Sequence, residues 1–119
     1  MSITKISFTV ILLGLLLSFN SSAQNVDTSL VVNGVCGMCK LNIETAVEEL
    51  KGVNKVSWDV ESKILSLNYD DSVVTLEQIN KAVNLAGYDT EYSTANEEAY
   101  EKLHGCCKYR DPEVVKSHQ

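Results

Sequence analysis

The chain has 119 residues, a formal net charge of −6 at pH 7 and four cysteines. This length suits one small domain. The acidic balance argues against nucleic acid as a partner, because a phosphate backbone attracts basic surfaces, and it weakly favours cations. The sequence contains no GxxxxGK[ST] phosphate loop and no paired-histidine motif, so we expect that the protein is not an enzyme.

Residues 1–23 have the order of a secretory signal peptide. Lys5 precedes an apolar run from Ile6 to Phe19, and the small residues of "SSA" follow, ending at Ala23. The run is shorter than the ~20 apolar residues that span a bilayer, which disfavours the alternative of a membrane anchor. We therefore expect cleavage after Ala23, no membrane anchor in the remaining chain, and a periplasmic location.

The remaining chain alternates between strand and helix patterns. Strands are predicted over 28–33, 53–60, 64–70 and, more weakly, 88–94, and helices over 40–50 and 76–86. This order predicts an α+β fold, a ferredoxin-like βαββαβ sandwich over residues 24–94. Alternation in the two middle strands predicts one buried face, made of Val56, Trp58, Val60, Leu65, Leu67 and Tyr69.

Capping residues in the sequence indicate where helices begin and end. Thr75 and Gln78 have the spacing of a capping box, and Gly87 suits a left-handed helix stop. Thr94 and Glu97 repeat the capping-box spacing before a short helix predicted over 95–103. Residues 95–119 therefore form a C-terminal helical tail outside the sandwich.

Cys36 and Cys39 lie between the first predicted strand and the first predicted helix. Two intervening residues allow both sulfurs to face one side of the loop. A helix N-terminus behind the pair favours negative charge and so favours thiolates, which bind Cu(I), zinc and similar soft ions. The same arrangement also serves redox enzymes, so a metal site, a redox pair and a disulfide all remain open from the pair alone.

Two longer segments carry a family resemblance: "VVNGVCGMCKLNIETAVEELKGVNKVSWDVESKILSLNYD" and "LEQINKAVNLAGYD". Over roughly 29–90 the chain resembles the heavy-metal-associated domain, a family of copper chaperones, soluble modules of copper-exporting ATPases and periplasmic mercury-binding proteins. The resemblance implies that Cys36 and Cys39 bind a metal ion. It implies Cu(I) as the expected ion, with Hg(II) or Zn(II) as alternatives, and a metal transporter or efflux component as partner.

Two further positions follow from the resemblance. Tyr88 matches an aromatic position that shields the metal in many bacterial members, and its alternative role is a plain core tyrosine. The methionine that usually precedes the first cysteine is missing, because Asn33, Gly34 and Val35 stand there. Val35 or Met38 is expected to fill the space, and Met38 has the alternative role of a thioether ligand.

The tail carries a second cysteine pair, Cys106 and Cys107. Adjacent cysteines are poorly placed to bridge each other, because a disulfide usually needs a longer Cα separation than neighbours have. We expect a packed tail helix to return this pair to Cys36 and Cys39 as additional thiolates. His104 is a weaker candidate ligand, and the alternative for the tail pair is a disulfide staple to the first pair.

Three functions follow from these features. The main one is a periplasmic metal-binding protein that transports, delivers or detoxifies the ion. A thiol–disulfide redox protein is the second, although the strand order is not that of thioredoxin and the only proline, Pro112, lies in the tail. The third is an accessory domain stapled by disulfides.

Overall fold

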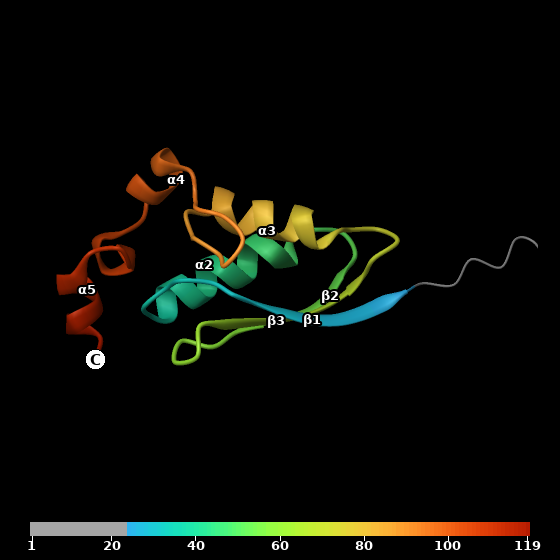
Figure 1. Cartoon of the computed structure of the whole chain (residues 1–119), viewed down its shortest axis with the longest axis horizontal. Helices are drawn as coiled ribbons and strands as arrows, with labels where there is room; N and C mark the ends of the chain where they lie inside the picture. Colours follow the sequence, from blue (N-terminus) through green and yellow to red (C-terminus); the bar gives the residue numbers. More distant parts are fainter. Residues whose placement is uncertain (1–23) are drawn as a thin grey trace, which may run out of the picture.

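The computed structural model describes residues 24–119, so the predicted signal peptide lies outside the described residues. The elements are, in chain order, β1 (Asn25–Val31), α2 (Gly37–Glu48), β2 (Val53–Trp58), β3 (Ile64–Asp70), α3 (Leu76–Leu85), α4 (Glu97–Glu101), the 3-10 helix η2 (Gly105–Cys107) and α5 (Pro112–Ser117). Three antiparallel strands form a sheet in the order β1-β3-β2. Helices α2 and α3 lie over one face of it (Figure 1). The predicted α+β fold is confirmed, and no helix of residues 24–119 is long and apolar enough to cross a membrane.

The core lies between the sheet and the two long helices. Leu65, Leu67 and Tyr69 are buried on β3, as the alternation predicted, and Ile43 and Ile79 meet them from α2 and α3. The start and end of α3 follow its sequence signals. The predicted capping box at the start of α3 is present, and Gly87 has the left-handed backbone that was expected after it.

Trp58 joins the core to the cysteine loop. Its ring is 1% exposed, and its Nε1 donates a hydrogen bond of 3.0 Å to the carbonyl oxygen of Val32. A Cβ atom on Gly34 would lie 2.9 Å from this ring, so only glycine lets the loop pass so close. Val60 was expected on the same buried face but is exposed, because β2 ends at Trp58 and the chain turns there.

The first long helix begins earlier than predicted. Cys36 is its N-cap residue with extended backbone, and the Lys40 amide already donates to the Cys36 carbonyl over 3.1 Å. Cys39 therefore lies inside the first turn of α2 rather than in the loop before it. The two cysteines thus lie on either side of the helix start.

The predicted last strand over 88–94 is wrong. Only an isolated antiparallel bridge forms there, between Val32 and Thr90. The Thr90 hydroxyl accepts hydrogen bonds from the Tyr92 and Ser93 amides, and the Thr90 amide donates to the Ser93 carbonyl over 2.8 Å. These local bonds close a turn and compete with strand pairing.

The tail helix also differs from its prediction. Asn96, not Thr94, caps α4, and its side chain accepts from the amides of the first turn. The Ala95 amide donates to Asp89 over 2.7 Å, which holds this position outside the helix. The helix α5, which was not predicted, begins at Asp111 and Pro112, a capping residue followed by proline at the first helical position.

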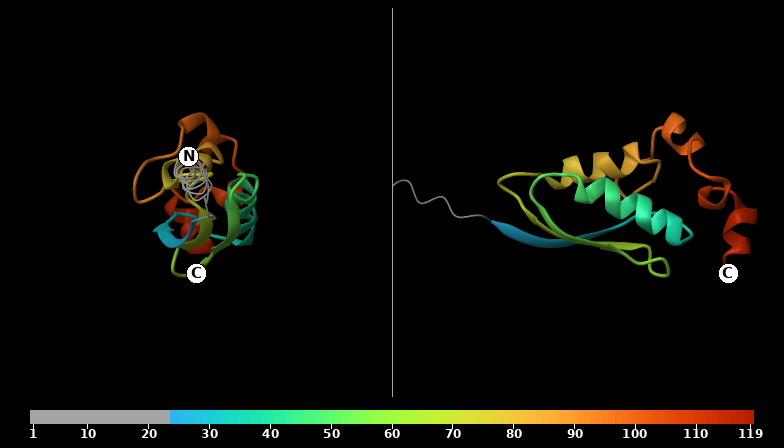
Figure 2. Two further views of the ribbon diagram at one scale, coloured as in Figure 1. Left: turned by 90° about the vertical axis from the view of Figure 1, so that its right-hand side faces the viewer. Right: turned by 180° about the vertical axis from the view of Figure 1, so that it is seen from behind.

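The tail closes one end of the domain. In two opposite views, α4, η2 and α5 lie at the end where α2 begins, away from the start of β1 (Figures 1 and 2). The cysteine loop and the tail cysteines are therefore at the same end of the molecule.

Candidate metal centre

Cys36 and Cys39 form a close pair at the N-terminal end of α2. Their sulfurs lie 3.6 Å apart, with Cys36 partly exposed and Cys39 fully buried. Burial of the thiol raises the pKa of Cys36, but hydrogen bonds from Cys39, Met38 and Cys107 outweigh it and leave this pKa below its ordinary value. The helix N-terminus favours the same charged form. Cys36 is thus suited to be a thiolate in a metal site.

The tail brings its own two thiols to this pair. Cys107 Sγ lies 3.8 Å from Cys36 Sγ, and Cys106 Sγ lies 4.0 Å from Cys107 Sγ. The sulfurs of Cys36, Cys106 and Cys107 lie within 4.8 Å of one another. All four cysteines are free thiols, with Cys107 buried and Cys106 exposed. The proximity of the two pairs, expected from the sequence, is therefore present.

Burial raises the pKa of Cys107, and the neighbouring Cys39 and Cys36 thiols raise it further. A cluster of thiols in close contact resists ionisation because like charges repel. A cation at the centre of the cluster would remove that repulsion. Thiolate sulfur is the ligand that soft ions such as Cu(I) and zinc prefer, so the donor set fits such an ion.

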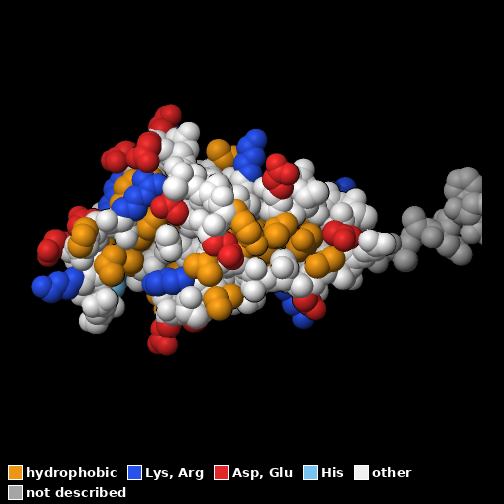
Figure 3. All heavy atoms as spheres, in the orientation of Figure 1, with side chains coloured by type: hydrophobic (Ala, Val, Ile, Leu, Met, Phe, Trp, Pro, Cys, Tyr) orange, Lys and Arg blue, Asp and Glu red, His pale blue; other side chains and the backbone are white. Residues whose placement is uncertain are grey.

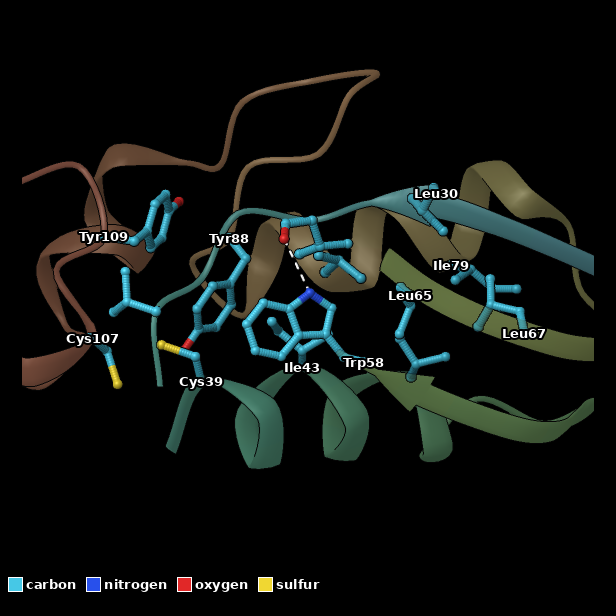
Figure 4. Packing of buried hydrophobic residues seen from close by; sticks show 14 of the residues in the cluster. Leu30, Cys39, Ile43, Trp58, Leu65, Leu67, Ile79, Tyr88, Cys107 and Tyr109 are labelled. Atoms are coloured by element: carbon cyan, nitrogen blue, oxygen red, sulfur yellow. Dashed lines mark hydrogen bonds between the residues drawn. The ribbon is translucent and has the colours of Figure 1, made fainter. Parts of the chain in front are cut away.

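The tail is held in place by Tyr109. Its hydroxyl donates to the Gly87 carbonyl over 2.8 Å and accepts from the Asp89 amide over 2.9 Å. Its ring stacks on Tyr88, with centroids 5.5 Å apart, and meets the Tyr100 ring edge-on at 5.2 Å. Figure 4 shows Tyr109 and Cys107 approaching Tyr88 and Cys39 from the tail.

Arg110 adds an ion pair to this contact. Its Nε and an Nη donate to the two oxygens of Asp89 over 3.0 and 2.7 Å, and its other Nη donates to Glu97 over 3.0 Å. Acidic and basic side chains lie side by side over the tail in Figure 3. The sequence reasoning missed this anchor. The sequence feature that could have indicated this ion pair is the aspartate of "AGYD", Asp89, and the arginine of "CCKYR", Arg110, which are 21 residues apart.

Tyr88 is a core residue that lies against the cysteine pair (Figure 4). Its side chain is fully buried, and its hydroxyl accepts a hydrogen bond of 3.0 Å from Asn42. In Figure 4 that hydroxyl lies beside the Cys39 sulfur. Burial strongly raises the pKa of Tyr88, opposed by the Asn42 bond, so the hydroxyl stays neutral. Tyr88 is a core residue that also covers the inner side of the thiol cluster.

The remaining predicted site residues, Val35, Met38 and His104, lie in different places. Val35, 8% exposed, is the residue that packs under the loop, while Met38 is 41% exposed. The Met38 sulfur lies 4.0 Å from Cys106 Sγ, so it borders the cluster on its outer side. His104 is exposed and is not among the three residues grouped above, of those that the structure describes.

Comparison with known proteins points to one family. The profile described as heavy-metal-associated domain matches residues 29–89. The copper chaperone CopZ of Staphylococcus aureus is 37% identical over 54 residues, which are 45% of this chain and 79% of CopZ. The profile match ends before the tail cysteines.

Solved structures agree with the sequence matches. A structure of the CopZ metallochaperone has a TM-score of 0.53 and 35% identity, covering 55% of this chain and 98% of its own. Oxidized MerP from Ralstonia metallidurans CH34 has a TM-score of 0.55 and 26% identity, covering 57% of this chain and 96% of its own. The CopZ relatives are a copper chaperone and a metallochaperone.

Proposed function

Because the chain belongs to the heavy-metal-associated domain family, we propose that it is an exported protein that binds Cu(I) in the periplasm through Cys36 and Cys39. Hg(II) and Zn(II) are the alternative ions. The observation that carries the proposal is the 3.6 Å separation of the two sulfurs at the start of α2. The copper-chaperone relatives support Cu(I), and MerP keeps Hg(II) as an alternative.

The chemistry of such a site is ligand exchange. A thiol loses its proton to solvent as its sulfur binds the ion, so two neutral thiols become two thiolates around one cation. Cys36 is the partly exposed sulfur of the pair, so an incoming thiolate from a partner can reach the ion there before a bond to Cys39 breaks. A metal transporter or efflux component is the proposed partner.

Metal content tests the proposal. The chain from residue 24 is purified under reducing, anaerobic conditions, and Cu(I), Hg(II) and Zn(II) are titrated against a competing chelator. We expect tight Cu(I) binding by the wild type and its loss in the double variant Cys36→Ser/Cys39→Ser. Retention of the wild-type circular dichroism spectrum by the variant controls for folding. If the wild type binds none of the three ions, the proposal is wrong.

Export is tested separately with the complete chain. Expression in a Gram-negative host, followed by fractionation and intact mass, should yield a periplasmic protein whose first residue is Gln24. A full-length mass in the cytoplasmic fraction would contradict the proposed export and would leave the metal-binding proposal standing.

A further inference from the structure

The four thiols form a continuous row. Cys36 is its centre, 3.6 Å from Cys39 and 3.8 Å from Cys107, and Cys106 follows at 4.0 Å from Cys107. Cys36 and Cys107 are 71 residues apart in sequence, so the fold of the tail alone makes this contact. The family profile ends at residue 89, which leaves the tail sulfurs outside what the family supplies.

The spacing of these sulfurs indicates more than two ligands. With thiolate–metal bonds of about 2.3 Å, two sulfurs on opposite sides of an ion lie about 4.6 Å apart. Three sulfurs around one ion lie about 4.0 Å apart for the same bond length, and four lie about 3.8 Å apart. The two contacts of Cys36, 3.6 and 3.8 Å, match the crowded arrangements rather than the linear one, although Cys39 itself lies outside the three sulfurs that are all within 4.8 Å of one another, those of Cys36, Cys106 and Cys107.

Cys107 is the better placed of the two tail thiols. Its side chain is fully buried, and its backbone is held by hydrogen bonds of 2.8 Å to the His104 carbonyl and from the Tyr109 amide. Cys106 is exposed and approaches the thioether of Met38. A buried sulfur in a fixed backbone loses little freedom when it binds an ion, so Cys107 is preorganised as a ligand.

We propose that Cys107 is a third ligand of the ion held by Cys36 and Cys39, so that the docked tail turns an open two-sulfur carrier site into a closed three-sulfur site. The inference rests on the proposed function. On binding, the Cys107 thiol releases its proton to solvent and its sulfur adds to the coordination of Cu(I), with no change of oxidation state. The docked tail places the Cys107 sulfur and the Cys106 carbonyl against the partly exposed Cys36 sulfur, so an incoming thiolate must displace Cys107 as well before the ion is released. The site is therefore suited to sequestration.

Copper X-ray absorption spectroscopy counts the sulfurs directly. With one Cu(I) per chain, we expect three sulfur neighbours in the wild type and two in Cys107→Ser. The comparison variant is Cys106→Ser, which removes the other tail thiol of the cluster; three neighbours retained there assign the third ligand to Cys107 rather than to Cys106. Competition with a chelator should show Cu(I) affinity weakened roughly tenfold or more in Cys107→Ser, because loss of a ligand costs at least as much as loss of a group that orients one.

Arg110→Gln supplies a test that leaves every thiol in place. Loss of the ion pair with Asp89 loosens the tail, so transfer of Cu(I) from the loaded protein to excess chelator should be faster than from the wild type. Glu113→Gln, a change at an exposed acid of α5, serves as its control and should transfer at the wild-type rate.

The outcomes separate the two proposals. Two sulfur neighbours in the wild type, three in Cys107→Ser, or a loss in Cys106→Ser alone would overturn the third-ligand inference while Cu(I) binding by Cys36 and Cys39 stands. Transfer from Arg110→Gln at the wild-type rate would overturn the closing role of the tail. A wild type that binds no Cu(I) would instead remove the proposed function itself.

Discussion

Removal of one hydroxyl should measure how firmly the tail is docked. Tyr109→Phe keeps the buried ring and its stacking on Tyr88 but removes the hydrogen bonds to Gly87 and Asp89. Each net hydrogen bond contributes about 1 kcal/mol, and the two backbone groups lose their partner in a partly buried place. We therefore expect the free energy of unfolding to fall by about 2 kcal/mol.

Urea unfolding of the reduced, metal-free protein measures this change. The single tryptophan, Trp58, is buried in the core and reports unfolding by fluorescence. Tyr92→Phe is the matched control, because its ring is 61% exposed and its hydroxyl has no hydrogen bond to the residues that the structure describes. The control should change stability by less than about 0.5 kcal/mol.

Thiol labelling provides a second measurement of the same perturbation. Cys107 is buried, so a reagent reaches it only when the tail opens. If the 2 kcal/mol is lost by the docked state alone, labelling of Cys107 should become roughly thirtyfold faster. Equal stability and equal labelling in Tyr109→Phe and Tyr92→Phe would refute the reasoning that this hydroxyl holds the tail.

Three further changes have defined outcomes. Gly34→Ala places a Cβ atom 2.9 Å from the Trp58 ring, so we expect about 1–3 kcal/mol of destabilisation in urea unfolding, and a neutral result would show that the loop can yield. Thr75→Ala removes the N-cap bond of α3 and should cost about 1 kcal/mol in the same assay, whereas Thr75→Ser should restore most of it. Burial raises the pKa of Asp89, but hydrogen bonds from Arg110 and the Ala95 amide, together with the Arg110 charge, outweigh it and hold this pKa below its ordinary value. The resulting stabilisation is complete above the ordinary carboxyl pKa of about 4 and disappears as pH falls through the lowered value. Arg110→Gln should therefore lower stability at pH 7 and flatten its fall in acid, and an unchanged pH profile would contradict the assignment.

Under the proposed function, the tail would distinguish two kinds of metal site. A two-sulfur site with a partly exposed Cys36 favours rapid exchange, whereas a third buried sulfur favours retention. The matched region, residues 29–89, is common to carriers and to this chain, so it does not distinguish them. Whether the site exchanges or retains the ion depends on whether Cys107 binds it and on how long Tyr109 and Arg110 keep the tail docked.

The sequence by itself determined the order of the main elements and the location of the first thiol pair. Alternation at Leu65, Leu67 and Tyr69 is a local signal for a strand with one buried face, and it was confirmed on β3. The capping box at Thr75 is equally local, because its partner lies three residues away. Such features are predictable since neighbours in sequence decide them.

The tertiary structure decided what the segments after α3 do, although the return of the tail cysteines to the first pair had been expected from the sequence. The segment 88–94 has strand-like composition, but side-chain bonds around Thr90 compete with the sheet, and composition does not weigh that competition. The approach of Cys107 to Cys36 depends on contacts made by Tyr109 and Arg110 with residues 20 or more positions away. Each contact requires the sandwich to exist first, because its partner backbone and carboxylate are brought to that end of the molecule only by the folded sheet and helices.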